Sequence, residues 1–377
     1  MTSTPTALRG AHVQQLMTTA QEARAQFVDV VATGPMFETL DRPVVSAGEM
    51  SFGQPTQRAY NQIAGRAGVP TKFAQRLQQD HHDLYCATMN ELYPAGPSLF
   101  RLRAVTGTDG DSVFAPVVRA VLSDRYQVID NVDVLTTMLQ AFIDSGLQAN
   151  DVQIHGDFDA DDGQLRLRCT VPSIGVHARE LVKNYRSPFD KRPGSELPMM
   201  FAGIEVSNSE TGGGAYTIRP RAVLQVCNNG MTRSVGDEQF RRVHLGAKLQ
   251  TDGVISWSDE TRRKQLELIG SAAQDAITTF ISPAYLQQLV DAATAAAGIE
   301  VDRVDEAMSM VTKTAMLSDD EASSVLRNWI TSADVSVLGL AHAVTATAQV
   351  VESSDRQSEL EQAFWTIVDS PLMYTGS

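Results

Sequence analysis

The stretch Leu99-Phe-Arg-Leu-Arg-Ala-Val105 alternates its side chains with a period of two. Successive side chains of a β-strand point to opposite faces, so this pattern predicts a half-buried strand whose apolar face carries Phe100, Leu102 and Ala104. A turn-forming segment at 106–111 and an apolar segment at 113–122 follow it. We therefore expect a β-hairpin here, and with it an antiparallel sheet.

Working outward from this hairpin, the chain divides into strand-rich and helix-rich parts. Further strands are expected at 151–158, 164–171, 201–207 and 215–226, and the glycine- and proline-bearing stretch 173–198 is expected to be a long loop. Helical periodicity marks 12–27, 131–145 and most of 259–368. These patterns predict an α+β fold with a central, mostly antiparallel sheet, hairpins and packed helices, followed by a helical C-terminal region. The expected divisions are an N-terminal helical region (1–95), a central α+β core (96–258) and a C-terminal helical region (259–377).

Two short helices are expected within 57–77, because Gly68 and Pro70 interrupt the helical pattern there. This arrangement is similar to a DNA-reading helix-turn-helix. Helix pairs with a glycine turn are also common packing units, so both interpretations stay open. In the first interpretation the second helix presents Lys72, Gln75, Arg76 and Gln79 to the DNA bases.

Composition and length limit the class of protein. The 377 residues are 43% hydrophobic and 20% charged, which is ordinary for a globular chain. No apolar run approaches the roughly 18 residues that cross a bilayer, and the first residues show no secretion signal. We therefore expect a cytoplasmic protein without membrane contact, located in the host cytoplasm if a phage encodes it. Cys86, Cys169 and Cys227 are too widely spaced for a disulfide scaffold or zinc site, so we expect reduced, buried thiols.

Common catalytic and cofactor motifs are missing from the sequence. It contains no phosphate-binding loop, dinucleotide fingerprint, zinc-protease helix or serine nucleophile elbow. Adjacent His81 and His82 make a poor metal chelate. The acidic group at 157–162 would need a glutamate at position 168 to form a calcium loop, and that residue is Arg168. We therefore predict neither a metal nor a cofactor.

The net charge of −14 is unevenly distributed. Residues 165–264 hold 16 Lys/Arg against 10 Asp/Glu, while the rest of the chain is strongly acidic. A basic segment of this kind either marks a surface for a polyanion or forms an ordinary solvated surface.

The basic segment combines paired arginines with aromatic rings, which favours single-stranded nucleic acid. Arg166 and Arg168 share one face of a predicted strand, as do Arg219 and Arg221. The stretch 179–192 adds five cations, Tyr185 and Phe189, and rings beside cations can stack on exposed bases. The prediction requires that these cations converge in one groove and are not neutralised by carboxylates. The candidate contacts are Arg125, Tyr126, Arg166, Arg168, Lys183, Asn184, Tyr185, Arg186, Lys191, Arg192, Arg219, Arg221, Asn228, Asn229, Arg233, Arg241 and Arg242.

Three segments carry a resemblance to a known family: Leu122-Ser-Asp-Arg-Tyr-Gln-Val-Ile-Asp-Asn131, Gly203-Ile-Glu-Val-Ser-Asn-Ser-Glu-Thr-Gly-Gly-Gly214 and Val226-Cys-Asn-Asn-Gly-Met231. With them the chain resembles the phage/plasmid-like family of domain of unknown function 932, over roughly residues 50–280. Members occur on mobile elements near replication and recombination genes, and similar sequences are placed near Rad52-like single-strand annealing proteins. That fold would suit a hairpin at 99–122, a strand near 126–129 and a helix at 131–145.

The resemblance and the basic segment together imply a strand-annealing protein for phage or plasmid recombination or replication. It would bind single-stranded DNA (or RNA), form a homo-oligomer, and contact a host or phage recombination protein.

Two other functions stay open. The first is a hydrolase acting on nucleic acid or nucleotides, with Glu210 as a base beside Arg125. Its polar residues would be Asp124, Arg125, Tyr126, Asn208, Ser209, Glu210 and Asn228. The second is a phage counter-defence or scaffold protein that binds another protein through an acidic surface, with the helical C-terminal region as its contact.

Overall fold

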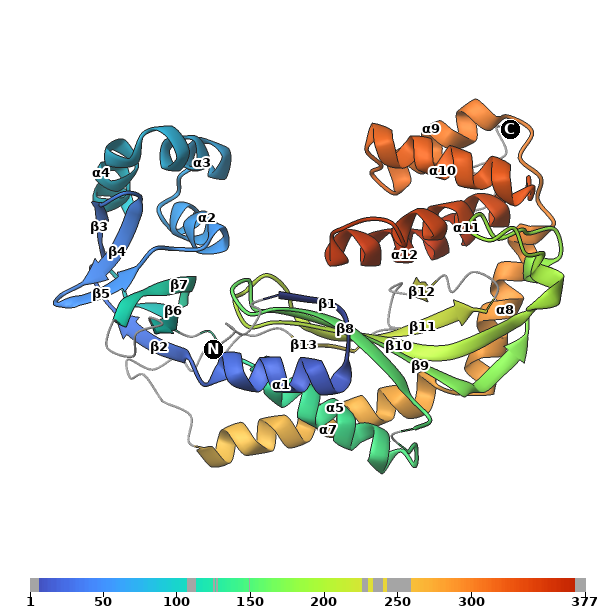
Figure 1. Cartoon of the computed structure of the whole chain (residues 1–377), viewed down its shortest axis with the longest axis horizontal. Coiled ribbons are helices and arrows are strands. Elements are labelled where there is room, and N and C mark those ends of the chain that lie inside the picture. The colour runs from blue at the N-terminus through green and yellow to red at the C-terminus, as the bar shows by residue number, and fades with distance from the viewer. Residues whose placement is uncertain are drawn as a thin grey trace.

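The computed structural model describes residues 7–106, 113–124, 126, 128–148, 150–225, 230–232, 240–242 and 259–369. It has the predicted α+β class, with antiparallel sheets and a helical C-terminal region. Figure 1 shows two lobes that rise from opposite ends of a central platform. We call them the N-lobe (residues 27–123) and the C-lobe (residues 304–369).

The platform is a seven-stranded sheet with helices packed beneath it. Six strands follow the order β1-β8-β9-β10-β11-β12, and β13 also pairs with β11; all of these pairings are antiparallel. Helices α1, α5 and α7 lie on the lower side in Figure 1. The strands are β1 (Ala7–His12), β8 (Gln153–Asp159), β9 (Gln164–His177), β10 (Met199–Ser209), β11 (Tyr216–Leu224), β12 (Gly230–Thr232) and β13 (Phe240–Arg242). The helices are α1 (Val13–Arg24), α5 (Asn131–Asp144), α6 (Arg179–Val182), α7 (Asp259–Phe280) and α8 (Pro283–Ala297).

The N-lobe contains two small sheets and three helices around its own hydrophobic core, which includes Phe37, Phe52, Tyr85 and Phe100. The predicted hairpin is confirmed as β6 and β7, and β6 also pairs with β2. Because of that pairing the expected boundary at residue 95 falls inside the lobe. The lobe consists of β2 (Phe27–Ala32), β3 (Met36–Thr39), β4 (Pro43–Ala47), β5 (Met50–Gly53), α2 (Gln57–Arg66), α3 (Thr71–Asp80), α4 (His82–Leu92), β6 (Ser98–Thr106) and β7 (Val113–Ser123).

The C-lobe is helical throughout. Every residue of α11 is buried, because α10 and α12 pack on it and α8 reaches it from the platform. A capping box begins α10: Ser318 accepts from the amide of Glu321, whose side chain accepts from the amide of Ser318. The helices are α9 (Val304–Thr314), α10 (Asp319–Ser332), α11 (Val337–Ala348) and α12 (Ser354–Val368).

Two local predictions are wrong. The stretch 173–198 is no single loop, since β9 continues to His177 and pairs with Met199 of β10, and the short helix α6 follows. The described residues of 126–129 form no third strand beside the hairpin. Instead, β6 and β7 belong to the N-lobe while α5 packs beneath the platform.

Within the described part of the chain, no helix combines the length and apolar character needed to cross a membrane.

Candidate functional site

One buried carboxylate, Glu210, joins the N-lobe to the platform. Its Oε2 accepts a hydrogen bond from Arg119 Nη2 at 2.7 Å, and its Oε1 accepts from the amide of Asn131 at 2.7 Å. Arg101 Nη1 donates to the Glu210 carbonyl at 3.0 Å. Glu210, Arg101 and Arg119 are all almost completely buried. A general base must contact the substrate, and Glu210 is enclosed by its own partners. The structure therefore gives no support to Glu210 as a base, and its proposed neighbour Arg125 lies outside the described residues.

The second buried charge cluster lies on the upper face of the platform sheet. The antiparallel register sets Glu205 of β10 directly between Arg168 of β9 and Arg219 of β11. Glu205 Oε1 accepts from Arg166 Nη1 at 3.0 Å and from Arg219 Nη1 at 3.4 Å. Burial alone would raise the pKa of Glu205, but Arg166, Arg168 and Arg219 lower it. Its carboxylate is thus held in the charged form.

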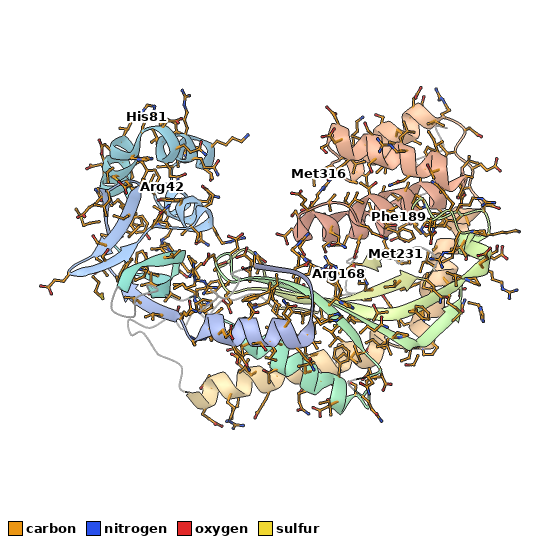
Figure 2. All side chains as sticks on the ribbon, in the orientation of Figure 1. Arg42, His81, Arg168, Phe189, Met231 and Met316 are labelled. Carbon is orange, nitrogen blue, oxygen red and sulfur yellow. The ribbon has the colours of Figure 1, made fainter. Side chains whose placement is uncertain are left out.

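Helix α12 supplies further carboxylates to this arginine face from above. Asp355 binds Arg166 Nη2 at 2.5 Å, and Glu361 binds both Nε and Nη2 of Arg221. Below them, Asp157 of β8 binds Arg168 Nη1 at 2.9 Å. Figure 2 shows Arg168 on the upper face of the platform, between the two lobes. The four strand arginines therefore lie on one face of the sheet, and each is paired with a carboxylate.

The remaining predicted contacts are dispersed. Tyr185 is buried, with its ring 5.0 Å from that of His342, and the hydroxyl of Tyr126 donates to the carbonyl of Ser209. Lys183 lies 3.9 Å from Glu180, and Arg192 pairs with Asp190. The predicted contacts whose side chains are exposed are Lys183, Asn184, Arg186, Lys191 and Arg192. Outside the described residues lie Arg125, Asn228, Asn229 and Arg233, and only the backbone of Arg241 and Arg242 is described.

Two neighbouring polar cavities open between the lobes, one beside each. The larger, about 500 Å³, lies between the sheet and α12, and we call it the α12 cavity. The smaller, about 390 Å³, lies against α2, and we call it the α2 cavity. Lining the α12 cavity are Gln164, Arg166, Ser207, Asn208, Gly213, Gly214, Ala215, Thr217, Arg219, Asp355, Ser358, Glu359 and Gln362. Lining the α2 cavity are Gln57, Arg58, Asn61, Gln62, Asp162 and Gly212.

The glycine run 212–214 forms a wall common to both cavities, since Gly212 lines one while Gly213 and Gly214 line the other. The amide of Gly213 donates to Ser209 Oγ at 2.9 Å, and Gly212 has a φ of 79°, which favours glycine. Gln62 of α2 donates to the carbonyl of Thr211 at 2.6 Å. The glycine run therefore lies between two adjacent cavities, which we together call the inter-lobe cleft.

The charges that a ligand meets in this cleft are mainly negative. The side chains of Asp355, Glu359 and Asp162 are 62%, 56% and 48% exposed. The arginine side chains of the same walls, Arg166, Arg219 and Arg58, are only 13%, 17% and 23% exposed. The arginines are buried beneath their partners, so they contribute little to the accessible surface.

The described residues contain neither a metal site with three or more protein ligands nor a reactive thiol. No group of three or more His, Cys, Asp or Glu side chains in that part of the chain is placed to hold a metal ion. Cys86 and Cys169 are free and buried, and burial raises the pKa of Cys169 to about 12, which makes it a poor nucleophile. Cys227 lies outside the described residues.

Sequence reasoning did not find the α2 side of the cleft. Gln62 and Thr211 are 149 residues apart, and no local pattern brings α2 to the glycine run. The glycines themselves were the available signal, because three in succession allow a close approach of other chain segments.

Comparison with known proteins adds no relative, since no family model, curated protein or solved structure matches the chain.

Proposed function

We propose that this chain is a binding protein that holds a segment of a partner protein in the inter-lobe cleft. The observation that carries the proposal is the pair of adjoining polar cavities whose exposed charges are carboxylates. Their size falls in or near the range of ligand sites, which is about 300–1,000 Å³. Because the two cavities share the glycine run, one extended segment can occupy both.

The uncharged groups of the cleft suit a polypeptide. A carboxamide side chain both donates and accepts hydrogen bonds, as a peptide group does, so the two are complementary. Hydroxyl groups of Ser207, Thr217 and Ser358 add further donors and acceptors to the α12 cavity. The carboxamides that line the two cavities are Gln57, Asn61, Gln62, Gln164 and Gln362.

The long-range charge also favours a basic partner over a polyanion. The C-lobe, residues 304–369, carries three Lys/Arg against eleven Asp/Glu. Among these eleven carboxylates, Asp334 and Glu361 alone are buried. A surface of one sign speeds the approach of an oppositely charged partner and repels nucleic acid. This supports the scaffold or counter-defence class of function.

The test is selection of displayed peptides of about twelve residues, a length that extended chain would stretch over some 40 Å, on the immobilised full chain. Gly214→Phe is designed to block the cleft, because Gly214 lines the α12 cavity and a Cβ there meets no atom within 4 Å. Gly96→Phe is the matched control, since Gly96 is equally open and lines neither cavity. We expect enrichment on the wild type and on Gly96→Phe, and its loss on Gly214→Phe. Equal enrichment on both variants, or none on the wild type, would exclude the proposal.

A separate observation favours single-stranded nucleic acid as a second ligand. The segment 186–193 forms an anchored tip. Arg186 forms an isolated β-bridge with Pro193, and the Arg186 amide donates to the Ser332 carbonyl at 3.0 Å. Phe189 is 49% exposed on this tip, and Lys191 has a φ of 64°, a strained conformation for a lysine. An exposed ring among cations is the arrangement that stacks on bases.

Fluorescence anisotropy with an oligothymidylate of about 16 nucleotides tests the tip. We expect weak binding that falls as salt rises, and a loss of about 1–3 kcal/mol in Phe189→Ala, the contribution of one stacked base. Lys72→Gln is the control, because it removes a cation from the helix-turn-helix-like pair instead. Should Lys72→Gln weaken binding while Phe189→Ala does not, the helix pair is the contact. Absence of binding at low salt removes this second function.

A further inference from the structure

We infer that a pair of histidines on strands β1 and β8 is a binding site for a divalent transition-metal ion. The antiparallel register places His12 directly opposite His155. Their ring centroids lie 4.5 Å apart, and the ring planes make an angle of 50°. Side chains in such opposite positions have Cβ atoms about 4.5–5.5 Å apart, so both can reach one small ligand. The inference is independent of the proposed function, because neither histidine lines the inter-lobe cleft.

Both imidazole rings lie on the upper face of the platform and are accessible. A Cβ at Gly156 would meet the side chain of Leu16 in α1, which lies beneath the sheet. The adjacent residue His155 therefore points to the opposite, upper face, and His12 faces it there. Both histidines are exposed, and no hydrogen bond joins either ring to another described residue. Their nitrogens are thus available to a ligand from solvent.

Two facing imidazoles can chelate one metal ion. An imidazole nitrogen is the commonest metal ligand that proteins supply. Two nitrogens that each lie about 2.0–2.1 Å from one ion are about 3 Å apart. His12 and His155 reach that separation through small rotations of their side chains, because their rings are already adjacent. Water completes the coordination, since no third His, Cys, Asp or Glu of the described chain joins the pair.

The charges beside the pair determine which ions can bind. Arg168 lies opposite His155 on β9 and donates to Asp157. Arg9 Nη1 lies 3.6 Å from the same carboxylate. The two arginines and one aspartate together carry a charge of +1, so the surroundings do not attract a cation by charge alone. Mg²⁺ and Ca²⁺ prefer oxygen ligands and have no such set here. Imidazole nitrogens with water oxygens suit Cu²⁺ or Ni²⁺, and Cu²⁺ binds such sites more tightly.

An ion at this site would fasten the first described strand to the platform. β1 lies at the edge of the described sheet, and its pairing with β8 shifts register between Leu8 and Ala11. His12 is the last residue of β1 and directly precedes α1. A shared ion would therefore link the two strands through side chains at the point where α1 begins. A ligand that binds only the folded chain stabilises it, so metal binding should hold β1 in place.

Titration of the full chain with Cu²⁺, followed by electron paramagnetic resonance, tests the site. We expect the tightest-bound ion to show coupling to two imidazole nitrogens. His12→Gln and His155→Gln should each weaken binding by about tenfold or more. The double variant should weaken it little further, because one remaining imidazole no longer chelates. Both side chains are exposed, so circular dichroism should show the same folded chain in every variant.

The matched control is His81→Gln/His82→Gln, which removes two adjacent histidines outside the site and should leave the affinity for Cu²⁺ unchanged. Excess Ni²⁺ should displace the copper, and excess Mg²⁺ should not. Equal weakening in the control and in His12→Gln would overturn the inference. So would single variants that each keep one tightly bound ion with unchanged affinity, because the copper would then occupy other sites.

Discussion

Glu210 links two parts of the chain that do not share a hydrophobic core. Replacement by glutamine removes the charge that Arg119 and Arg101 face in a buried position. Breaking one partner of a buried ion pair costs about 3–5 kcal/mol, so we expect Glu210→Gln to lose that much unfolding free energy in urea titrations. Glu306→Gln is the control, because Glu306 pairs with Arg303 on the surface and should cost at most about 1 kcal/mol. Equal costs would mean that the junction contributes no more than a surface pair.

His342 makes the stability of the C-lobe dependent on pH. Burial lowers the pKa of His342 to about 4 from 6.5, and the charge of Asp334 opposes only part of that shift. The unfolded chain therefore binds the proton more readily than the folded one. Full stability is present above pH 6.5 and is lost as the pH falls towards 4, by roughly 3 kcal/mol. Urea titrations at several pH values should show this slope in the wild type and a reduced slope in His342→Phe; an unchanged slope would assign it to other groups.

Local sequence patterns could not predict which single arginines are buried. The period of two in β6 correctly placed Phe100 and Leu102 on the core side, but it gave Arg101 a half-exposed face. In the structure Arg101 is fully buried, because it contacts Asp29, Asp130 and the carbonyl of Glu210, the last 109 residues away. The alternation of residue types along a strand shows which side chains share a face. Distant segments of the chain determine whether that face is buried.

At the scale of elements, the contact between β9 and β10 depends on a glycine. A Cβ at Gly203 would fall far inside contact distance of the Cys169 carbonyl on the neighbouring strand. We expect Gly203→Ala to lose about 1–3 kcal/mol or more, since the backbone must shift to make room. Gly214→Ala is the control: its Cβ meets nothing within 4 Å and should change stability by less than about 1 kcal/mol. Thermal unfolding followed by circular dichroism compares them, and similar midpoints would show that the strands tolerate the added methyl group.

The capping box of α10 is a feature that sequence alone can predict. Its residues are close together in the chain, so the pattern contains all of the interacting groups. Ser318→Ala should cost about 1 kcal/mol of unfolding free energy. Ser323→Ala, within the same helix, removes a hydroxyl that donates to the Asp319 carbonyl and should cost less. Equal costs in urea titrations would contradict a capping role.

The stretch 173–198 shows the opposite case. Its glycines and prolines predicted a loop, but residues 175–177 continue β9 through a register shift against Phe201 and Ala202. Pairing with a partner strand overrode the local signal there. The cleft was unpredictable for a similar reason, because α2 and α12 reach it from opposite ends of the chain.

At the scale of the whole molecule, two hydrophobic cores meet at a charged junction. The N-lobe core and the core shared by the platform and C-lobe are separate clusters of buried residues. Arg101 of the N-lobe joins them through Asp130 and Glu210. We expect calorimetry to give one transition for the wild type and a separate, earlier N-lobe transition for Arg101→Met. Two transitions in the wild type, or one in the variant, would show that the junction does not couple the cores.

The position of α12 above the sheet also has a consequence for synthesis on the ribosome. Arg221 is translated before its partner Glu361, which follows 140 residues later in the chain. At about 5–20 residues per second, roughly 7–28 seconds pass between their translation. During that interval the emerging strands present uncovered guanidinium groups close to ribosomal RNA. Slow codons or a pause before the last helix would prolong this exposure, so the yield of folded chain should depend on how fast the final segment is translated.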